Sequence, residues 1–258
     1  MQLPSGTIAQ LSRDPFVTGA VTLSLNGVVQ SHVSLRDPRA LFYDYVRRMG
    51  TAIDLAAPPA EPITVVHLGA GGLTLARYVA ETRPGSRQVV VEFERGLVAF
   101  VLEEAPLPRG SRVSLVEADA LAALRMLRDG LVDGVDWLGC ADVLVGDVYA
   151  GLETPAHLTT PEFYSAAREL LAPGGVLLVN VADDADLAHT NAQSEALAVA
   201  FPVVAVVGPA ALLEGREVGN TVLLAGTDPA MLSRMPALAA EGPHPVAWHA
   251  ITPPPVTQ

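Results

Sequence analysis

Four apolar stretches of this 258-residue sequence are each followed by residues suited to binding a small molecule. Small residues follow the first stretch, "ITVVHL", and an acidic residue ends each of the segments "VVVE", "VEAD" and "VLVGD". Ligands bind beyond the carboxyl ends of the strands in a parallel sheet, so these residues are predicted to meet at one edge. They are Gly69, Gly71 and Gly72 in the first group and Glu92, Asp119 and Asp147 in the second.

These residue types fit an adenosine that carries no phosphate. Glycines let a ligand approach the backbone, and the helix that follows presents free N–H groups. The Glu92 carboxylate can accept hydrogen bonds from both hydroxyls of a ribose, and Asp119 can accept one from the exocyclic amine of adenine. Asp119 is equally suited to cap the following helix. The combination favours S-adenosylmethionine or a relative, although the spacing of about twenty residues from Gly69 to Glu92 also fits NAD.

The elements that position these residues follow from the hydrophobic periodicity. Residues 6–33 alternate between apolar and polar and contain an Asn-Gly turn in "LNGVV", which predicts a small antiparallel sheet. Residues 38–54 have helical spacing. From residue 63, five strand–helix units predict a doubly wound, mostly parallel α/β sheet with helices on both faces. We expect the final strand, "GNTVLLAG", to run antiparallel, as in the Rossmann-like sheet of the S-adenosylmethionine methyltransferase type.

The Pro-rich stretch "AAPPAEP" at residues 56–62 is the clearest internal boundary. We therefore predict a small N-terminal β-hairpin domain with a helix over residues 1–57. The Rossmann-like nucleoside-binding domain is predicted over 58–240. The Pro-rich end of the chain, residues 241–258, is predicted to be a loose tail.

Composition excludes several classes of function. The net charge is −12, and a protein that tracks a nucleic-acid backbone needs a basic face, so no nucleic-acid partner is expected. All 16 basic residues are Arg, which excludes a P-loop lysine and a Schiff-base lysine. No apolar run approaches the roughly 20 residues that span a bilayer, so no membrane association is expected. With Cys140 as the only cysteine and no leader pattern, we expect a cytoplasmic protein without a metal site.

Six motifs in order resemble the spermidine synthase family, the polyamine aminopropyltransferases, over residues 18–226. They are "LNGVVQ", "FYDY", "HLGAGG", "VVVEFE", "VEADAL" and "VGDVYAG", which is followed by "TPAHLTTPEFY". The resemblance implies that Gln30 lines the active site and that Glu92 and Asp119 bind the ribose and the adenine. It also implies that Asp147 is the catalytic acid of the loop. Tyr43 and Tyr149 are the hydrogen-bond partners expected for the acceptor, and Tyr43 is also expected to assist Asp147.

The same resemblance implies the substrates and the assembly. The donor would be decarboxylated S-adenosylmethionine, the acceptor a diamine or another polyamine-type amine, and no prosthetic group would be needed. The family forms dimers or tetramers, so we expect a homodimer, for which the N-terminal hairpins offer edge strands.

Two departures from the family pattern concern the amine half of the site. The family has "GGGDGG" in its glycine loop, and Gly72 here stands where the family has Asp. Ala150 replaces the second acid of the catalytic Asp-Ser-x-Asp loop. Hydrogen bonds to charged groups contribute roughly 1.5–3 kcal/mol each, so the amine site is interpreted as eroded. His157 and His67 are interpreted as structural residues.

Two alternatives stay open at this point. Gly72 removes a negative charge and leaves room, which would let S-adenosylmethionine bind with its carboxylate, and the protein would then be a methyltransferase. Loss of both amine-binding acids also suits a non-catalytic relative that binds a nucleoside or only a protein partner.

Overall fold

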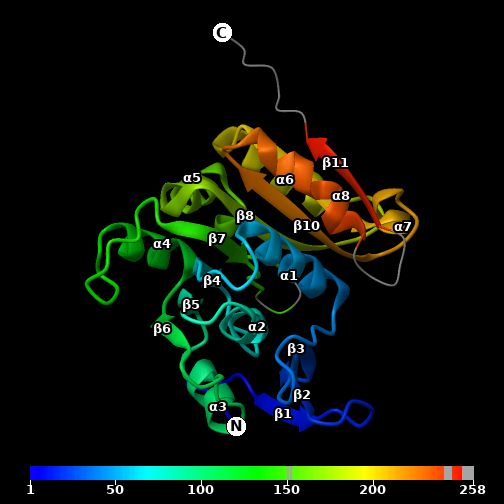
Figure 1. The fold of residues 1–258 in the computed structure, drawn as a ribbon. Coiled ribbons are helices and arrows are strands. Elements are labelled where there is room, and N and C mark those ends of the chain that lie inside the picture. The colour runs from blue at the N-terminus through cyan, green and yellow to red at the C-terminus, as the bar shows by residue number, and fades with distance from the viewer. Residues whose placement is uncertain (150, 152, 241–245, 252–258) are drawn as a thin grey trace.

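The computed structural model describes residues 1–149, 151, 153–240 and 246–251 of the chain. Within these residues the chain forms a three-stranded sheet and an eight-stranded sheet, with helices packed around the second (Figure 1). The N-terminal sheet consists of β1 (Ala9–Arg13), β2 (Ala20–Leu25) and β3 (Val28–Ser34). The strands of the large sheet are β4 (Thr64–Leu68), β5 (Arg87–Glu92), β6 (Arg112–Glu117), β7 (Ala141–Gly146), β8 (Leu171–Asp183), β9 (Val203–Pro209), β10 (Gly219–Gly226) and β11 (Val246–Ile251).

The helices of the described chain alternate with these strands. They are α1 (Asp44–Ala56), α2 (Thr74–Thr82), α3 (Leu97–Glu104), α4 (Ala120–Arg128), α5 (Pro161–Leu170), α6 (Ala188–Ala200), α7 (Ala210–Leu213) and α8 (Met235–Ala240), with 3-10 turns η1 (Ala156–Leu158) and η2 (Pro229–Arg234). None of the described helices is long and apolar enough to cross a membrane.

The N-terminal sheet is a meander in the order β1-β2-β3, and both pairs are antiparallel. Its second turn is the predicted Asn-Gly turn, with φ of 49° at Asn26 and 81° at Gly27, the left-handed conformation that such hairpin turns require. Leu23 and Ala9 of this sheet pack with α2 and α3 in one apolar cluster. This packing sets the N-terminal sheet beside the glycine loop that precedes α2.

The large sheet has the order β11-β9-β10-β8-β7-β4-β5-β6. Strands β6, β5, β4, β7 and β8 are parallel, and β10 is antiparallel to both β8 and β9. One apolar cluster joins α4, α5 and α6 to one face, and a second joins α1, α2 and α8 to the other. The doubly wound fold with an antiparallel strand near its end is therefore confirmed, and the winding reverses between β4 and β7.

The turn after β4 and the C-terminal segment add detail to the predicted fold. Helix α2 begins at Thr74, because Gly69, Gly71 and Leu73 have positive φ values and form the turn after β4. Residues 246–251, which were predicted to lie in a loose tail, form β11 along β9. The boundary at 57/58 stays a prediction, but α1 contributes Val46, Met49 and Ile53 to the core beneath the large sheet. Residues 241–245 and 252–258 of the predicted tail lie outside the described residues.

The Pro-rich connector between α1 and β4 is held by a buried arginine. The Arg83 guanidinium, at the end of α2, donates to the carbonyl oxygens of Asp54, Ala57, Pro58 and Glu61 at 2.7–3.0 Å. Only 1% of Arg83 is exposed. This one buried side chain therefore ties the last turn of α1, through Asp54, to three carbonyl groups of the connector.

Replacing Arg83 by Ala should remove four hydrogen bonds from a charged donor and lower the free energy of unfolding by about 3 kcal/mol. For a domain of this size the melting temperature should fall by roughly 10 °C, which calorimetry or circular dichroism would measure. Arg109→Ala, at an exposed loop position, is the matched control and should change little. An equal loss in both variants would refute the role given to the Arg83 carbonyl contacts.

Candidate active site

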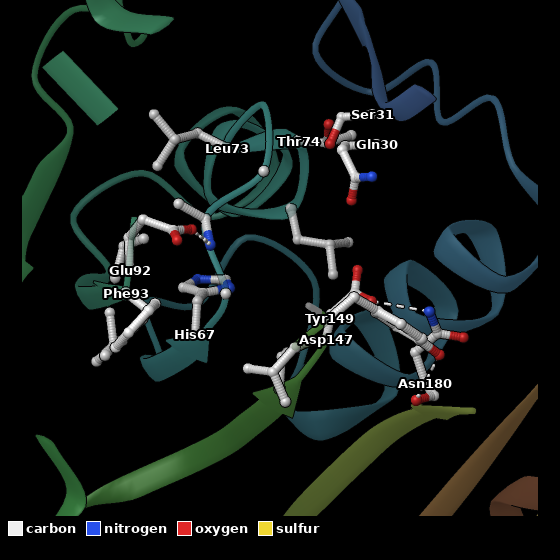
Figure 2. Close-up of a pocket in the computed structure, with 18 of the residues that line it drawn as sticks. Gln30, Ser31, His67, Leu73, Thr74, Glu92, Phe93, Asp147, Tyr149 and Asn180 are labelled. Carbon is white, nitrogen blue, oxygen red and sulfur yellow. Dashed lines mark hydrogen bonds between the residues drawn. The ribbon is translucent and has the colours of Figure 1, made fainter. Parts of the chain in front are cut away.

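A cavity of about 490 Å³ lies at the carboxyl ends of the central parallel strands. The large sheet and its loops form its floor, and β3 and the start of α1 form the opposite wall. Figure 2 shows Glu92 and Phe93 on one side of this cavity and Gln30, Tyr149 and Asn180 on the other. The cavity is lined by Gln30, Tyr43, Gly69, Gly71, Glu92, Asp119, Asp147 and Tyr149, so it brings together the predicted site residues except Gly72.

The glycine loop lies against the end of β7. The backbone N–H of Asp147 donates to the carbonyl of Leu68 at 2.9 Å, and Gly69 has φ of 92°. A Cβ on Gly69 would overlap the carbonyl oxygen of Asp147. Glycine is therefore required at position 69 both by conformation and by space. This close approach puts the Asp147 carboxylate beside the glycine loop.

The space beside Gly72 is occupied, although the sequence predicts that it is free. The backbone N–H of Gly72 donates to Ser31 Oγ at 2.9 Å. A Cβ at this position would overlap a methyl group of Val33 and lie 3.2 Å from Ser31 Cβ. The space beside Gly72 is filled by β3, because the N-terminal sheet packs directly on the loop.

Glu92 is the last residue of β5, and its carboxylate accepts hydrogen bonds from two backbone N–H groups. Its Oε2 accepts a hydrogen bond from the N–H of Ala70 at 3.0 Å, and its Oε1 accepts one from Glu94 at 2.8 Å. Burial raises the pKa of Glu92 above the ordinary value, and these backbone donors partly offset the rise. The side chain is thus held in a fixed orientation at the cavity wall, close to the glycine loop.

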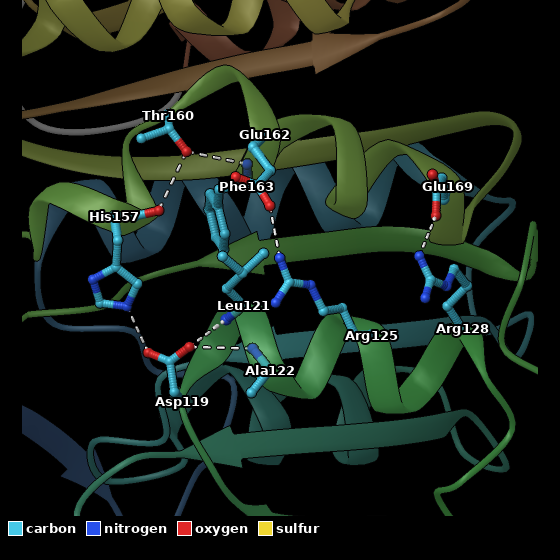
Figure 3. Close-up of polar contacts among 10 residues, drawn as sticks. All are labelled: Asp119, Leu121, Ala122, Arg125, Arg128, His157, Thr160, Glu162, Phe163 and Glu169. Atoms are coloured by element: carbon cyan, nitrogen blue, oxygen red, sulfur yellow. Dashed lines mark hydrogen bonds and ion pairs between the residues drawn. The ribbon is translucent and has the colours of Figure 1, made fainter.

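Asp119 caps α4, which is one of the two roles that the sequence left open, and it also lines the cavity. Its Oδ1 accepts from the N–H groups of Leu121 and Ala122 at 3.0 and 3.1 Å, and its Oδ2 lies 2.7 Å from His157 Nε2 (Figure 3). Partial burial raises its pKa, but the hydrogen bonds from His157 and the backbone outweigh burial, so the pKa lies below the ordinary value. His157, interpreted from the sequence as structural, is therefore a cavity residue paired with Asp119.

Asp147 is a half-buried acid on the cavity wall. Its Oδ1 accepts a hydrogen bond from Asn180 Nδ2 at 2.8 Å, and the Tyr45 hydroxyl donates to its Oδ2 at 3.5 Å, near the limit for such a bond. Asn220 Nδ2 in turn donates to Asn180 Oδ1 at 3.0 Å. Burial raises the pKa of Asp147, and the hydrogen bonds from Asn180 and Tyr45 oppose the rise. Such a carboxylate is poised to take up a proton.

The two tyrosines predicted for the acceptor are arranged differently. The Tyr149 hydroxyl accepts from the N–H of Ala182 at 2.7 Å and donates to the carbonyl of Asn180 at 3.2 Å. Its hydroxyl is thus used to hold β8, while the side chain lines the cavity. Tyr43 stacks on Tyr45 with 6.1 Å between ring centroids, and Tyr45 is the tyrosine that contacts Asp147.

Some residues of this arrangement had no clear signal in the sequence. Tyr45 lies two residues from Tyr43 in the same motif, and only the packing of α1 distinguishes them. Asn180 follows the apolar run "GVLLV" in the same way as the acids follow theirs, and this signal could have been used.

His67 was interpreted as a core histidine. It is buried, bonds Gln88 at 2.8 Å, and burial lowers its pKa to about 4, so it is neutral at neutral pH. Ala150 lies outside the described residues.

The strand order and the helices on both faces define the class of protein. This is a Rossmann-like α/β fold of the methyltransferase type. The structure is similar to that of human methyltransferase-like protein 13 in complex with SAH, with a TM-score of 0.60 and 20% sequence identity. That likeness covers 76% of this chain and 90% of the human protein and concerns the fold. No established family profile matches the sequence.

Two further comparisons are more specific. A probable spermidine synthase from Corynebacterium glutamicum superimposes with a TM-score of 0.79 and 30% identity, over 94% of this chain and 87% of that one. The polyamine aminopropyltransferase of Chromobacterium violaceum is 28% identical over 153 residues, or 59% of this chain. That match spans 54% of the Chromobacterium protein, about half of its length. The chain belongs to the spermidine synthase family.

The raised pKa of Asp147 predicts the effect of removing its charge on stability. A raised pKa means that the ionised carboxylate costs folding free energy, and this cost appears as the pH rises through the folded-state pKa. Asp147→Asn should therefore melt at a higher temperature than the wild type at pH 8. The difference should vanish near pH 4, about the ordinary aspartate pKa, as the carboxyl becomes protonated.

Asp129→Asn is the control for this measurement. Asp129 is exposed, and its ion pair with Arg128 lowers its pKa, so its removal should give no gain in stability at pH 8. A lower melting temperature for Asp147→Asn at pH 8 would mean that the ionised carboxylate stabilises the fold, contrary to this account.

Proposed function

We propose that the protein transfers an aminopropyl group from decarboxylated S-adenosylmethionine to an amine. The observation that carries the proposal is the position of a half-buried, hydrogen-bonded carboxylate, Asp147, in the same cavity as Glu92 and Asp119. The family relationship supports the reaction type, and the curated relative bears the name polyamine aminopropyltransferase. Fold alone does not decide an activity, so the weight rests on these side chains.

In this proposal the donor's nucleoside occupies the end of the cavity near β5 and β6. Glu92 accepts hydrogen bonds from the ribose hydroxyls, and its backbone contacts to Ala70 and Glu94 hold it ready for them. Asp119 accepts from the adenine amine on the Oδ2 side, where His157 already donates. Gly69 and Gly71 let the ligand approach the backbone of the loop. Gln30, on β3, contributes a polar group to the opposite wall.

The chemical step needs a neutral amine and a base. The amine nitrogen attacks the propyl carbon bonded to the sulfonium sulfur, a C–N bond forms, and the C–S bond breaks. The electron pair of that bond stays on sulfur, which becomes the neutral thioether of methylthioadenosine. The proton lost by the amine nitrogen passes to Asp147, whose raised pKa suits this role. Asn180 and Tyr45 hold the carboxylate in place.

One observation favours a second candidate, methyl transfer. The position beside Gly72 is closed by Val33 and Ser31, so the loop offers no acid for a donor ammonium. S-adenosylmethionine carries its own carboxylate next to its ammonium and needs no acid from the protein at this point. Formation of S-adenosylhomocysteine from S-adenosylmethionine and an amine would replace the first proposal.

The first experiment incubates the protein with decarboxylated S-adenosylmethionine and a panel of primary amines and measures methylthioadenosine by chromatography. We expect product from at least one amine, and a loss of about 10²–10⁴-fold in turnover for Asp147→Asn, the range attributed to general acid–base catalysis. Asp129→Asn should keep the wild-type rate, because Asp129 lies in no contact with the cavity residues. Absence of product from every amine would refute aminopropyl transfer.

The two tyrosines can be separated by their effect on pH dependence. The Tyr45 hydroxyl lowers the pKa of Asp147, so Tyr45→Phe should raise that pKa and move the acid limb of kcat/KM to higher pH. Loss of one such bond, about 1 kcal/mol, should also lower kcat/KM about fivefold. Tyr43→Phe is the matched variant and should leave the acid limb in place. If the acid limb of kcat/KM shifts in Tyr43→Phe and not in Tyr45→Phe, the contact with Asp147 belongs to Tyr43, as the sequence predicted.

A further inference from the structure

We propose that the acceptor is a primary amine with a single cationic group and an apolar remainder, rather than a diamine. This inference rests on the proposed transfer reaction and names the class of acceptor that the cavity takes. It follows from the acidic side chains on the cavity wall and from the apolar side chains that β3 and the segment before α1 add to that wall.

The acidic side chains on the described wall of the cavity are Glu92, Asp119 and Asp147. Glu92 and Asp119 lie at the end assigned to the nucleoside, where each is also fixed by the backbone. Asp147 is therefore the one carboxylate, among the described lining residues, that remains for the donor chain and the acceptor together. The donor chain already brings one ammonium to this end, so no described lining carboxylate remains for a second ammonium on the acceptor.

The neighbouring positions do not supply a second acid. At Gly72, the strand β3 fills the space that a side chain would need. Asp14 lies behind His32 rather than on the cavity wall, and its carboxylate is used by the N–H groups of Phe16 and Val17 and by His32 at 3.1 Å. Burial lowers the pKa of His67 on the cavity floor to about 4, so it adds no charge at neutral pH.

The remaining polar groups near Asp147 are neutral and mostly engaged. Asn180 donates to Asp147 and accepts from Asn220. The Tyr149 hydroxyl is used by the backbone of β8. A second ammonium at this end would lose its hydration and gain no carboxylate partner. An unpaired charge in a partly closed cavity is strongly disfavoured.

The wall formed by β3 and the start of α1 carries exposed apolar side chains instead. Val28, Val29 and Phe42 line the cavity and are 38%, 52% and 48% exposed. Phe42 is held by stacking on His32, with 4.2 Å between ring centroids. Phe42 also contacts Tyr43, which stacks on Tyr45 beside Asp147. An alkyl or aryl group of the acceptor that covers Phe42 would gain the free energy of apolar burial, which a second ammonium would forfeit.

The transfer step is unchanged by this choice of acceptor. The single amine nitrogen of the acceptor forms the C–N bond, the C–S bond of the donor breaks with its electron pair on sulfur, and the proton moves to Asp147.

The test is a calorimetric titration of the protein, saturated with methylthioadenosine, with two amines of equal chain length at the same pH. We expect 1-aminobutane to bind at least tenfold more tightly than 1,4-diaminobutane. Equal affinities, tighter binding of the diamine, or no binding of either amine would overturn the inference. Methylthioadenosine binding is measured first. If the nucleoside binds and the diamine is preferred, only the acceptor class is refuted. If the nucleoside does not bind, the proposed function itself is refuted.

A second variant tests the charge argument directly. Gln30→Glu adds a carboxylate to the wall opposite Glu92 with little change in shape (Figure 2). It should reduce the preference for 1-aminobutane by at least fivefold. Gln10→Glu adds the same charge at an exposed position of β1, away from the cavity, and should leave the preference unchanged. The same shift in both variants would show that overall charge, and not the cavity wall, selects the amine.

Discussion

The close approach of the β4 and β7 ends is the constraint on which the rest of the site depends. The N–H of Asp147 donates to the carbonyl of Leu68, and Gly69 turns the chain away with a conformation and a clearance that a side chain would not allow. This contact closes the point where the winding of the sheet reverses. It brings the carboxylate after β7 next to the loop after β4, and so joins the two halves of the cavity.

The buried polar groups around Asp147 extend this junction across the sheet. Asn220 of β10 contacts Asn180 of β8, which contacts Asp147 after β7, and Tyr45 reaches the same carboxylate from α1. A buried acid without such partners would be expected to lose its charge or destabilise the fold. The antiparallel strand β10 therefore has a role in the site, because it supplies the outer member of this chain of hydrogen bonds.

Local patterns in the sequence predicted much of the fold and part of the site. The Asn26–Gly27 turn and the Asp119 cap of α4 each depend on residues that are neighbours in sequence, and both are present. The acids after three strands were also found, because strand ends are visible in the apolar pattern. What the sequence missed depends on contacts between distant segments. Strand β11 forms only through pairing with β9, and Gly72 is closed only because Val33 packs on it.

The central claim is that the cavity binds an adenosine thioether through Glu92 and the glycine loop. The direct measurement is a calorimetric titration with methylthioadenosine of the wild type, of Glu92→Gln, and of Glu103→Gln as a control at an exposed position of α3. We expect binding by the wild type and the control, and affinity at least tenfold weaker for Glu92→Gln, because a charged hydrogen-bond acceptor is lost. No binding by the wild type, or equal affinity in all three proteins, would contradict the account.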